Sequence, residues 1–172
     1  WKVFMLMAMF GSTGAGAQTM PAQPTLSSGE PFDTSAWAGK VVLFVNVASK
    51  CGFTPQYDGL QNLWTENKAK GLVVVGVPCN QFGAQEAGSS GEIQSFCRMN
   101  FGVDFPLLHK QEVNGSDRSP LYDYLLKGRT PVLWNFEKVL VGKDGKVVDR
   151  YRSTTKPDSK KMLKAIQSAL GA

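Results

Sequence analysis

Runs of apolar residues predict the strands of this chain. Val41 to Val47 and Leu72 to Val77 are near-continuous apolar runs, rich in valine, as expected for strands that are buried on both faces. Two shorter runs, Lys138 to Val141 and Val147 to Tyr151, flank Lys143-Asp144-Gly145-Lys146. The Asp-Gly pair in that connection indicates an antiparallel hairpin.

Four helices are predicted from start and stop signals combined with apolar residues at helical spacing. The first follows the first strand, with Thr54 as its N-cap, Pro55 at the first helical position and Gly71 at its end. The second begins near Ser89, which has the capping-box spacing to Glu92. The others begin at Ser119-Pro120, with Gly128 at the end, and after Pro157.

The order of these elements predicts the fold class. A βαβ unit, two helices, a β-hairpin and a final helix give an α/β domain of thioredoxin-like arrangement, with a mixed central sheet and helices on both faces. A turn at Ser28-Gly29-Glu30 adds a small hairpin before the first long strand. The chain has 172 residues, 42% of them hydrophobic, which is enough to bury the core of one domain.

The N-terminus differs in composition from the rest of the chain. Val3 to Phe10 is an apolar block that is too short to span a bilayer, which takes roughly 20 residues. Ala15-Gly16-Ala17 follows with the small-residue form of a cleavage site. We therefore expect a signal peptide over residues 1–17, a single domain over 18–172 and export to the periplasm. The alternative is a mobile tail or an edge strand on a cytoplasmic protein.

Charge and metal-ligand spacing exclude several function classes. The net charge of +5 is spread along the chain without a dense basic run, which argues against nucleic-acid binding. It could still favour anionic membrane surfaces or acidic partners. Three cysteines and the single His109 show none of the usual zinc spacings, so we expect no metal and no cofactor.

Cys51 is the first candidate for chemistry, because it lies between the end of a buried strand and the start of a helix. Free backbone N–H groups, the helix dipole and neighbouring Lys50 favour a thiolate there and predict a low thiol pKa. The alternative is a small buried hydrophobe. Thr54 occupies the position of a CxxC partner, which excludes that mechanism, and Ala48-Ser49-Lys50 fits a peroxiredoxin poorly.

Three separated segments resemble the glutathione peroxidase family, and the similarity covers roughly Gly39 to Leu170. Asn46 to Thr54 resembles its active-site segment, with cysteine in place of selenocysteine. Pro78 to Glu86 resembles the second signature, and Trp134-Asn135-Phe136 the third. Val77 and Ala87 stand where the family usually has phenylalanine and proline, which concerns only loop detail.

The resemblance implies a peroxidase with the catalytic residues Cys51, Gln85, Trp134 and Asn135. Amide and indole N–H groups can stabilise a thiolate and hold the hydroperoxide, and attack would convert Cys51 to a sulfenic acid. Taken without the family, Trp134 would more often belong to a core, Asn135 to a turn and Gln85 to a solvated loop.

The resemblance also implies how the oxidised enzyme is recycled. Cys97 matches the family's resolving cysteine, which forms a disulfide that a thioredoxin-like protein or glutathione then reduces. Its apolar helical face, shared with Ile93 and Phe96, equally suits a core cysteine, and Cys79 is usually outside the disulfide. The short passage from Leu126 to Trp134 resembles monomeric members that accept lipid hydroperoxides.

Two other function classes remain open at this point. A peroxide sensor that passes its disulfide to a partner protein would use the same Cys51 and Cys97, and catalytic turnover would separate it from an enzyme. An exported protein of purely structural role would leave the set of four candidate catalytic residues unexplained.

Overall fold

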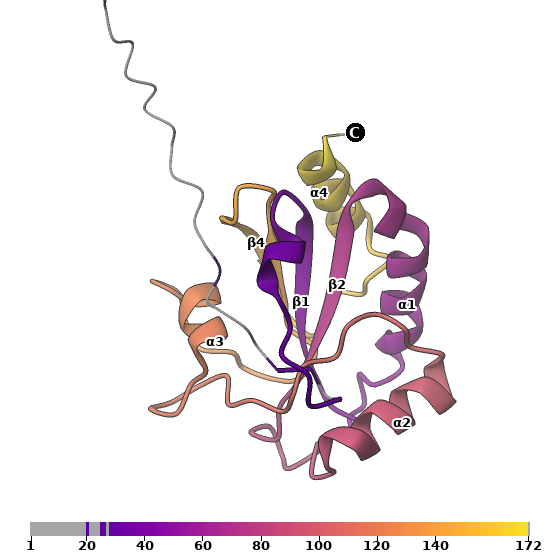
Figure 1. Cartoon of the computed structure of the whole chain (residues 1–172), viewed down its shortest axis with the longest axis vertical. Helices are drawn as coiled ribbons and strands as arrows, with labels where there is room; N and C mark the ends of the chain where they lie inside the picture. Colours follow the sequence, from indigo (N-terminus) through magenta and orange to yellow (C-terminus); the bar gives the residue numbers. More distant parts are fainter. Residues whose placement is uncertain (1–19, 21–24, 27, 172) are drawn as a thin grey trace, which may run out of the picture.

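The computed structural model describes residues 20, 25–26 and 28–171. They form strands and helices that Figure 1 shows in the colours of the sequence. In chain order the elements are η1 (Thr34–Trp37), β1 (Val41–Val47), α1 (Gln56–Asn67), η2 (Lys68–Lys70), β2 (Leu72–Pro78), α2 (Ser90–Phe101), α3 (Pro120–Leu125), β3 (Lys138–Val141), β4 (Val147–Tyr151) and α4 (Lys160–Leu170). The four predicted strands are all confirmed, and β2 is one residue longer than expected.

The sheet is mixed, with the strand order β2-β1-β3-β4. β1 pairs with β2 in parallel through Val41↔Leu72, and with β3 antiparallel through Val42↔Val141. The predicted hairpin of β3 and β4 is confirmed. Because β1 and β2 are parallel, their carboxyl ends meet at one edge, which is where ligands bind in open α/β sheets.

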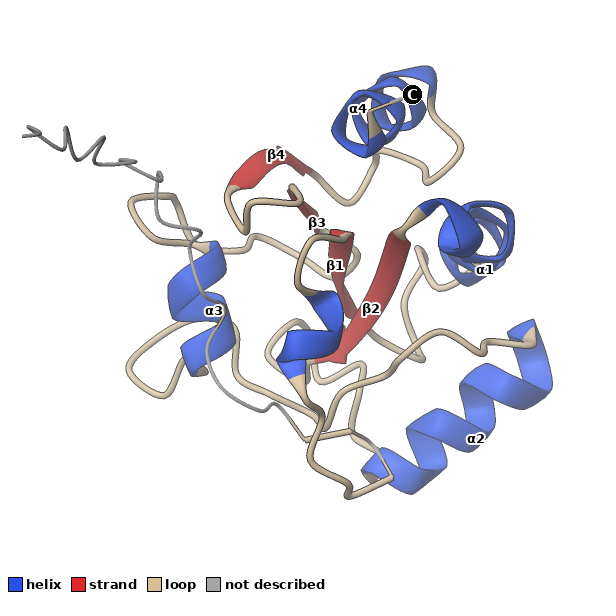
Figure 2. Ribbon diagram, turned by 45° about the horizontal axis from the view of Figure 1, so that its top comes forward, coloured by secondary structure: helices blue, strands red, loops and turns tan. Residues whose placement is uncertain are grey.

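Helices cover both faces of the sheet, as predicted (Figure 2). Val41, Leu43 and Val45 of β1 pack on one side into a core shared with α1, α2 and α4. Alternate residues Val42 and Phe44 pack on the other side into a core shared with η1 and α3. This alternation follows from the two-residue period of a strand, and it explains why the β1 run is continuously apolar.

Local signals placed three of the four helix starts correctly. Ser89 and Glu92 form the predicted capping box at the start of α2, and Ser119 caps α3. The α4 helix begins after Pro157, as predicted, with Ser159 as its cap. The prediction of Thr54 as the cap of α1 was wrong, because the N-cap is Pro55, without a side-chain hydrogen bond.

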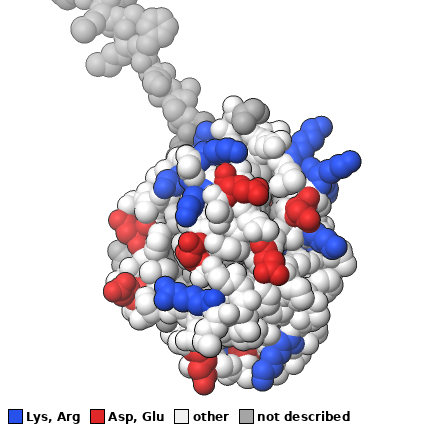
Figure 3. Space-filling model, turned by 90° about the vertical axis from the view of Figure 1, so that its right-hand side faces the viewer, with Lys and Arg blue, Asp and Glu red and all other residues white. Residues whose placement is uncertain are grey.

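The N-terminal turn is confirmed, because the Gly29 N–H donates to the Leu26 carbonyl and Thr25 bridges to Pro31. The predicted signal peptide, residues 1–17, lies outside the described residues. Within the described part of the chain, no helix combines the length and the apolarity needed to cross a bilayer. On the face in Figure 3, basic and acidic side chains are interspersed, as expected from the spread of charge along the sequence.

Candidate active site

Cys51 lies in the turn that follows β1, and its side chain is partly exposed. The Cys51 N–H donates to Thr54 Oγ1 at 3.0 Å, and the Thr54 hydroxyl donates to the Ala48 carbonyl at 2.8 Å. These bonds occupy the hydroxyl that sequence reasoning assigned to a helix cap. The Phe53 N–H points at Cys51 Sγ at 3.4 Å, so a backbone donor is directed at the sulfur atom.

Gln85 follows a tight turn after β2 and lies beside the Cys51 turn. The Lys50 N–H donates to the Gln85 carbonyl at 3.1 Å. Gly83 and Ala84 both have positive φ, at 69° and 52°, and the conformation is uncommon for alanine. A Cβ atom on Gly83 would lie 3.3 Å from the Trp134 ring, so glycine permits the close approach of this turn to Trp134.

Trp134 and Asn135 come from the loop that precedes β3. The Trp134 side chain is 38% exposed and its ring lies 5.9 Å from that of Phe82, so this tryptophan is not a core residue. Asn135 is buried, and its Nδ2 atom donates to Gln85 Oε1 at 2.9 Å and to the Phe82 carbonyl at 3.5 Å.

The structure therefore brings Gln85, Trp134 and Asn135 together. The Cys51 turn lies beside them, because the N–H of the preceding residue, Lys50, binds the Gln85 carbonyl. It also changes the expected role of Asn135, whose amide N–H groups are directed at Gln85 and Phe82. Among the described residues, Gln85 Nε2 and Trp134 Nε1 have no hydrogen-bond partner and remain available as donors. The buried Asn135 Oδ1 atom likewise lacks a partner and can accept a hydrogen bond.

Glu86 is a buried residue of this region to which the sequence reasoning gave no role. Its Oε1 atom accepts the Ser49 N–H at 3.0 Å, which ties the Gln85 turn to the segment before Cys51. Burial raises the pKa of this carboxyl group, and the Ser49 hydrogen bond and the Lys110 charge oppose the shift. The only sequence signal was its position directly after Gln85 in the second family-like segment.

Cys97 lies on the inner face of α2, as predicted, and is completely buried in the apolar core. Burial raises the pKa of its thiol to about 11, although the Tyr57 hydroxyl partly opposes the shift. Cys79 is buried as well, and burial raises its pKa too. All three cysteines are free thiols in this structure.

A cavity of about 280 Å³ lies between the Cys51 turn and α2. Its walls combine polar groups of the two active-site segments with apolar groups of α2, and they comprise Ser49, Lys50, Gln85, Glu86, Ala87, Gly88, Glu92, Ile93 and Phe96. This cavity is adjacent to the candidate residues. Within the described ranges, no cluster of side chains has the composition of a metal site.

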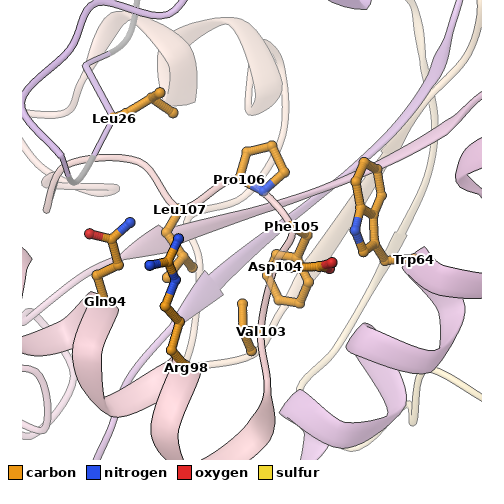
Figure 4. A pocket seen from close by; sticks show the side chains of 9 residues that line it. All are labelled: Leu26, Trp64, Gln94, Arg98, Val103, Asp104, Phe105, Pro106 and Leu107. Atoms are coloured by element: carbon orange, nitrogen blue, oxygen red, sulfur yellow. The ribbon is translucent and has the colours of Figure 1, made fainter.

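A second cavity of similar volume, about 280 Å³, lies between α1 and α2. Figure 4 shows Gln94 and Arg98 projecting into it from α2, opposite Trp64 of α1. It shares no lining residue with the cavity beside Gln85.

The fold and the cysteine-centred site define the protein first as a thioredoxin-fold thiol protein. A thioredoxin-family thiol:disulfide interchange protein from Chlorobium tepidum has the same fold, with a TM-score of 0.65 and 16% identity over 91% of this chain and 100% of that one. The crystal structure of Trgpx in apo form is 40% identical, with a TM-score of 0.70 over 87% of this chain and 93% of that one.

The family follows from the sequence comparisons. The glutathione peroxidase family model matches residues 21–126. Hydroperoxy fatty acid reductase Gpx2 of Synechocystis is 53% identical over 88% of this chain and 99% of its own length. The glutathione peroxidase-like peroxiredoxin HYR1 of Saccharomyces cerevisiae is 51% identical over 79% of this chain and 87% of its own length. The chain belongs to the glutathione peroxidase family, and the predicted peroxidase activity, with a peroxide substrate and a thiol reductant, is confirmed.

Proposed function

We propose that Cys51 is the peroxidatic residue of this enzyme. Its thiolate attacks the terminal oxygen of the hydroperoxide and the O–O bond breaks. Cys51 then becomes a sulfenic acid, while the other oxygen leaves with a proton as an alcohol or water. The observation that carries this proposal is the partly exposed Cys51 sulfur, with the Phe53 N–H directed at it, beside the Gln85–Asn135 pair.

Gln85 and Trp134 act as hydrogen-bond donors in this reaction, and Asn135 supports them. The free Gln85 Nε2 and Trp134 Nε1 groups stabilise the developing negative charge on the leaving oxygen. Asn135 orients Gln85 through the 2.9 Å bond to its Oε1 atom. The unpartnered Asn135 Oδ1 atom is an acceptor for the O–H of the incoming hydroperoxide.

Cys97 resolves the sulfenic acid. Its sulfur attacks the sulfur of Cys51, the S–OH bond breaks, and the thiol proton leaves with the hydroxyl group as water, which yields a disulfide. A disulfide requires Cα atoms within about 7 Å, so α2 unwinds around Cys97 for this step. A thioredoxin-like protein or glutathione then reduces the disulfide. One relative, from Escherichia coli, is named thioredoxin/glutathione peroxidase BtuE.

Lipid hydroperoxides are the proposed substrate class, with hydrogen peroxide as a smaller alternative. Two relatives carry the name hydroperoxy fatty acid reductase. The cavity between Gln85 and α2 offers the apolar side chains of Ile93 and Phe96 beside the donor groups. Leu133, which is 63% exposed, adds apolar surface next to Trp134. We propose that the enzyme is a monomer, so this surface remains open.

Peroxide consumption by the purified protein tests this function. Turnover of a fatty-acid hydroperoxide should be faster with a thioredoxin system than with glutathione at matched thiol concentration. A protein that is oxidised once by peroxide and is then not reduced by either system would instead be a sensor that passes its disulfide to a partner. Absence of any Cys51 oxidation would contradict both functions.

We further propose that the protein is exported to the periplasm with residues 1–17 removed. The support is the apolar Val3 to Phe10 block followed by Ala15-Gly16-Ala17. The periplasm is oxidising, so an exported peroxidase needs a thioredoxin-like protein that is kept reduced there. N-terminal sequencing of protein from native cell fractions should find a start at or near Gln18. An intact leader on cytosolic protein would refute export.

A further inference from the structure

The loop that carries Trp134 and Asn135 is held almost entirely by side chains. From Thr130 to Trp134, the backbone makes no hydrogen bond to another backbone group in the described part of the chain. Asn114 binds both the N–H and the carbonyl of Val132, and Asn46 Nδ2 binds the Trp134 carbonyl at 3.0 Å. The position of the two candidate active-site residues therefore depends on specific side-chain contacts.

Glu137 supplies one of these contacts from a buried position. Its side chain is 2% exposed, and its Oε1 atom accepts the Leu133 N–H at 2.7 Å, directly before Trp134. Its Oε2 atom accepts both Nε and an Nη of Arg150, at 3.0 and 2.8 Å. Arg152 also reaches Oε1, at 3.0 Å, from a half-exposed position.

Arg150 extends the same contact to the beginning of the loop. Its guanidinium group donates to the Thr130 carbonyl at 2.5 Å and to the Pro131 carbonyl at 2.8 Å, while it also binds Glu137. One planar group thus joins the buried carboxylate to two carbonyls of the loop. The fork geometry of arginine suits several fixed acceptors at once, which lysine cannot reproduce.

A strained residue next to the loop shows that its conformation is imposed by the surroundings. Phe136 is buried and has a φ of 61°, which is unfavourable for a bulky residue and persists only where neighbouring contacts fix it. Buried ion pairs contribute little net stability, because desolvation offsets their attraction. The Glu137–Arg150 pair is therefore better explained by the conformation it fixes than by stability.

We propose that Glu137 and Arg150 are positioning residues that hold the Trp134–Asn135 loop in its reactive geometry. The inference rests on the proposed function, in which Trp134 and Asn135 assist the attack of Cys51 on the hydroperoxide. Neither residue reaches the reacting atoms in this account. Both act through the loop, on the rate of Cys51 oxidation and not on the later reduction of the disulfide.

Glu137→Gln tests the pair directly, since the amide oxygen can still accept the Leu133 N–H while the second position no longer accepts from Arg150. The second-order rate constant of Cys51 oxidation by peroxide should fall about tenfold, because small displacements of catalytic groups have effects of this size or larger. The rate of disulfide reduction by thioredoxin should stay unchanged. Arg150→Lys keeps the charge but loses the fork and should show the same loss.

A double-mutant cycle separates positioning from a general structural role. In protein that already carries Trp134→Phe and Asn135→Ala, the Glu137→Gln change should reduce oxidation less than about twofold, because the groups it positions are absent. An undiminished tenfold loss in that background would overturn the proposal. So would a Glu137→Gln protein that oxidises at the unmutated rate.

Two control variants guard against effects of charge or stability. Asp123→Asn removes the same charge from a more exposed ion pair, between Arg118 and Asp123 of α3, and should leave the oxidation rate unchanged. Ile166→Ala in α4 removes buried apolar volume from the core and should lower the urea midpoint of unfolding, while Ile166 makes none of the hydrogen bonds that hold the loop. If it slows oxidation as much as Glu137→Gln, the positioning role is wrong. Cys51-dependent oxidation in every variant would still leave the proposed function intact.

Discussion

The surroundings of Cys51 and Cys97 differ in almost every respect. Cys51 is partly exposed in a turn, with a backbone N–H on its sulfur and amide and indole groups nearby. Cys97 is buried on a helix among apolar side chains, and burial raises its pKa to about 11. The sulfur of Cys51 is thus already partly exposed, as the proposed attack on peroxide requires, whereas the proposed resolving step needs α2 to open first.

The largest effect is expected from Cys51→Ser, which removes the thiol that is proposed to attack the peroxide. Peroxide reduction should fall below about 1% of the unmutated rate, because an alcohol is far less acidic than a thiol and cannot form a sulfenic acid. Stopped-flow peroxide consumption measures the rate. Cys79→Ser is the matched control and should retain most activity, since Cys79 is buried outside the proposed disulfide.

Cys97→Ser should separate the two halves of the reaction. Turnover supported by a thioredoxin system should disappear, while one rapid oxidation of Cys51 per molecule remains, because resolution follows the chemical step. Quench-flow with a sulfenic-acid reagent would detect that single oxidation. Sustained thioredoxin-supported turnover in this variant would mean that Cys97 is a core cysteine only.

Gly91→Ala tests whether α2 must open. Gly91 lies in the first turn of α2, and an added Cβ atom would meet nothing within 4 Å. Alanine stabilises a helix over glycine by up to about 1 kcal/mol, which corresponds to roughly fivefold slower disulfide formation if the helix unwinds first. The initial oxidation of Cys51 should be unaffected.

The control for this helix variant is Ser168→Ala, an exposed position in α4 where alanine also improves helix propensity. It should change neither step, because α4 carries none of the three cysteines. Both rates can be followed by tryptophan fluorescence after mixing with one equivalent of peroxide. Equal rates of disulfide formation in Gly91→Ala and unmutated protein would argue against unwinding.

A further effect is expected on stability and not on the peroxide reaction, and it arises at the buried Lys138, whose Nζ atom contacts the first residue of α1. Its Nζ atom donates to Gln56 Oε1 at 2.5 Å and to the Thr155 carbonyl at 2.6 Å. Burial lowers the pKa of Lys138 from 10.5 to about 7, although the Glu137 charge opposes the shift. Between these values the unfolded chain binds one proton more, so the free energy of unfolding should rise with pH.

The Lys138→Met variant cannot bind this proton. Its comparison with the unmutated protein therefore isolates the contribution of Lys138 to the pH dependence of the free energy of unfolding. Urea unfolding of both proteins at pH 7, 8 and 9 should show that the unmutated protein gains stability relative to the variant by at most about 1.4 kcal/mol per pH unit. The gain is complete above pH 10.5 and is lost as the pH falls to about 7. Parallel pH profiles of the two proteins would show that Lys138 is not perturbed in this way.

The fold could be predicted from the sequence where local pattern and tertiary role agree. The valine-rich run Val41–Val47 is a strand at the predicted bounds because both of its faces meet core. Thr54 failed as a helix cap because its hydroxyl is used in the Cys51 turn, a contact that no periodicity reveals.

The residues of the candidate site were likewise predicted only in part. The family-like segments placed Gln85, Trp134 and Asn135 in one region of the molecule, and the structure brings them together. The buried charges Glu86 and Glu137 went unrecognised, because each depends on partners from distant parts of the chain. Arg150 faces Glu137 only once β3 and β4 are paired, and periodicity does not report which charged side chain turns inward.

Peptide mapping after oxidation tests the central claim most directly. Reduced, purified protein is treated with one equivalent of a hydroperoxide, blocked with an alkylating reagent and digested without reduction, and the cross-linked peptides are identified by mass spectrometry. The account predicts a disulfide between Cys51 and Cys97, with Cys79 alkylated. A disulfide that contains Cys79, or a Cys51 that is still alkylated as a free thiol after the peroxide has been consumed, would contradict it.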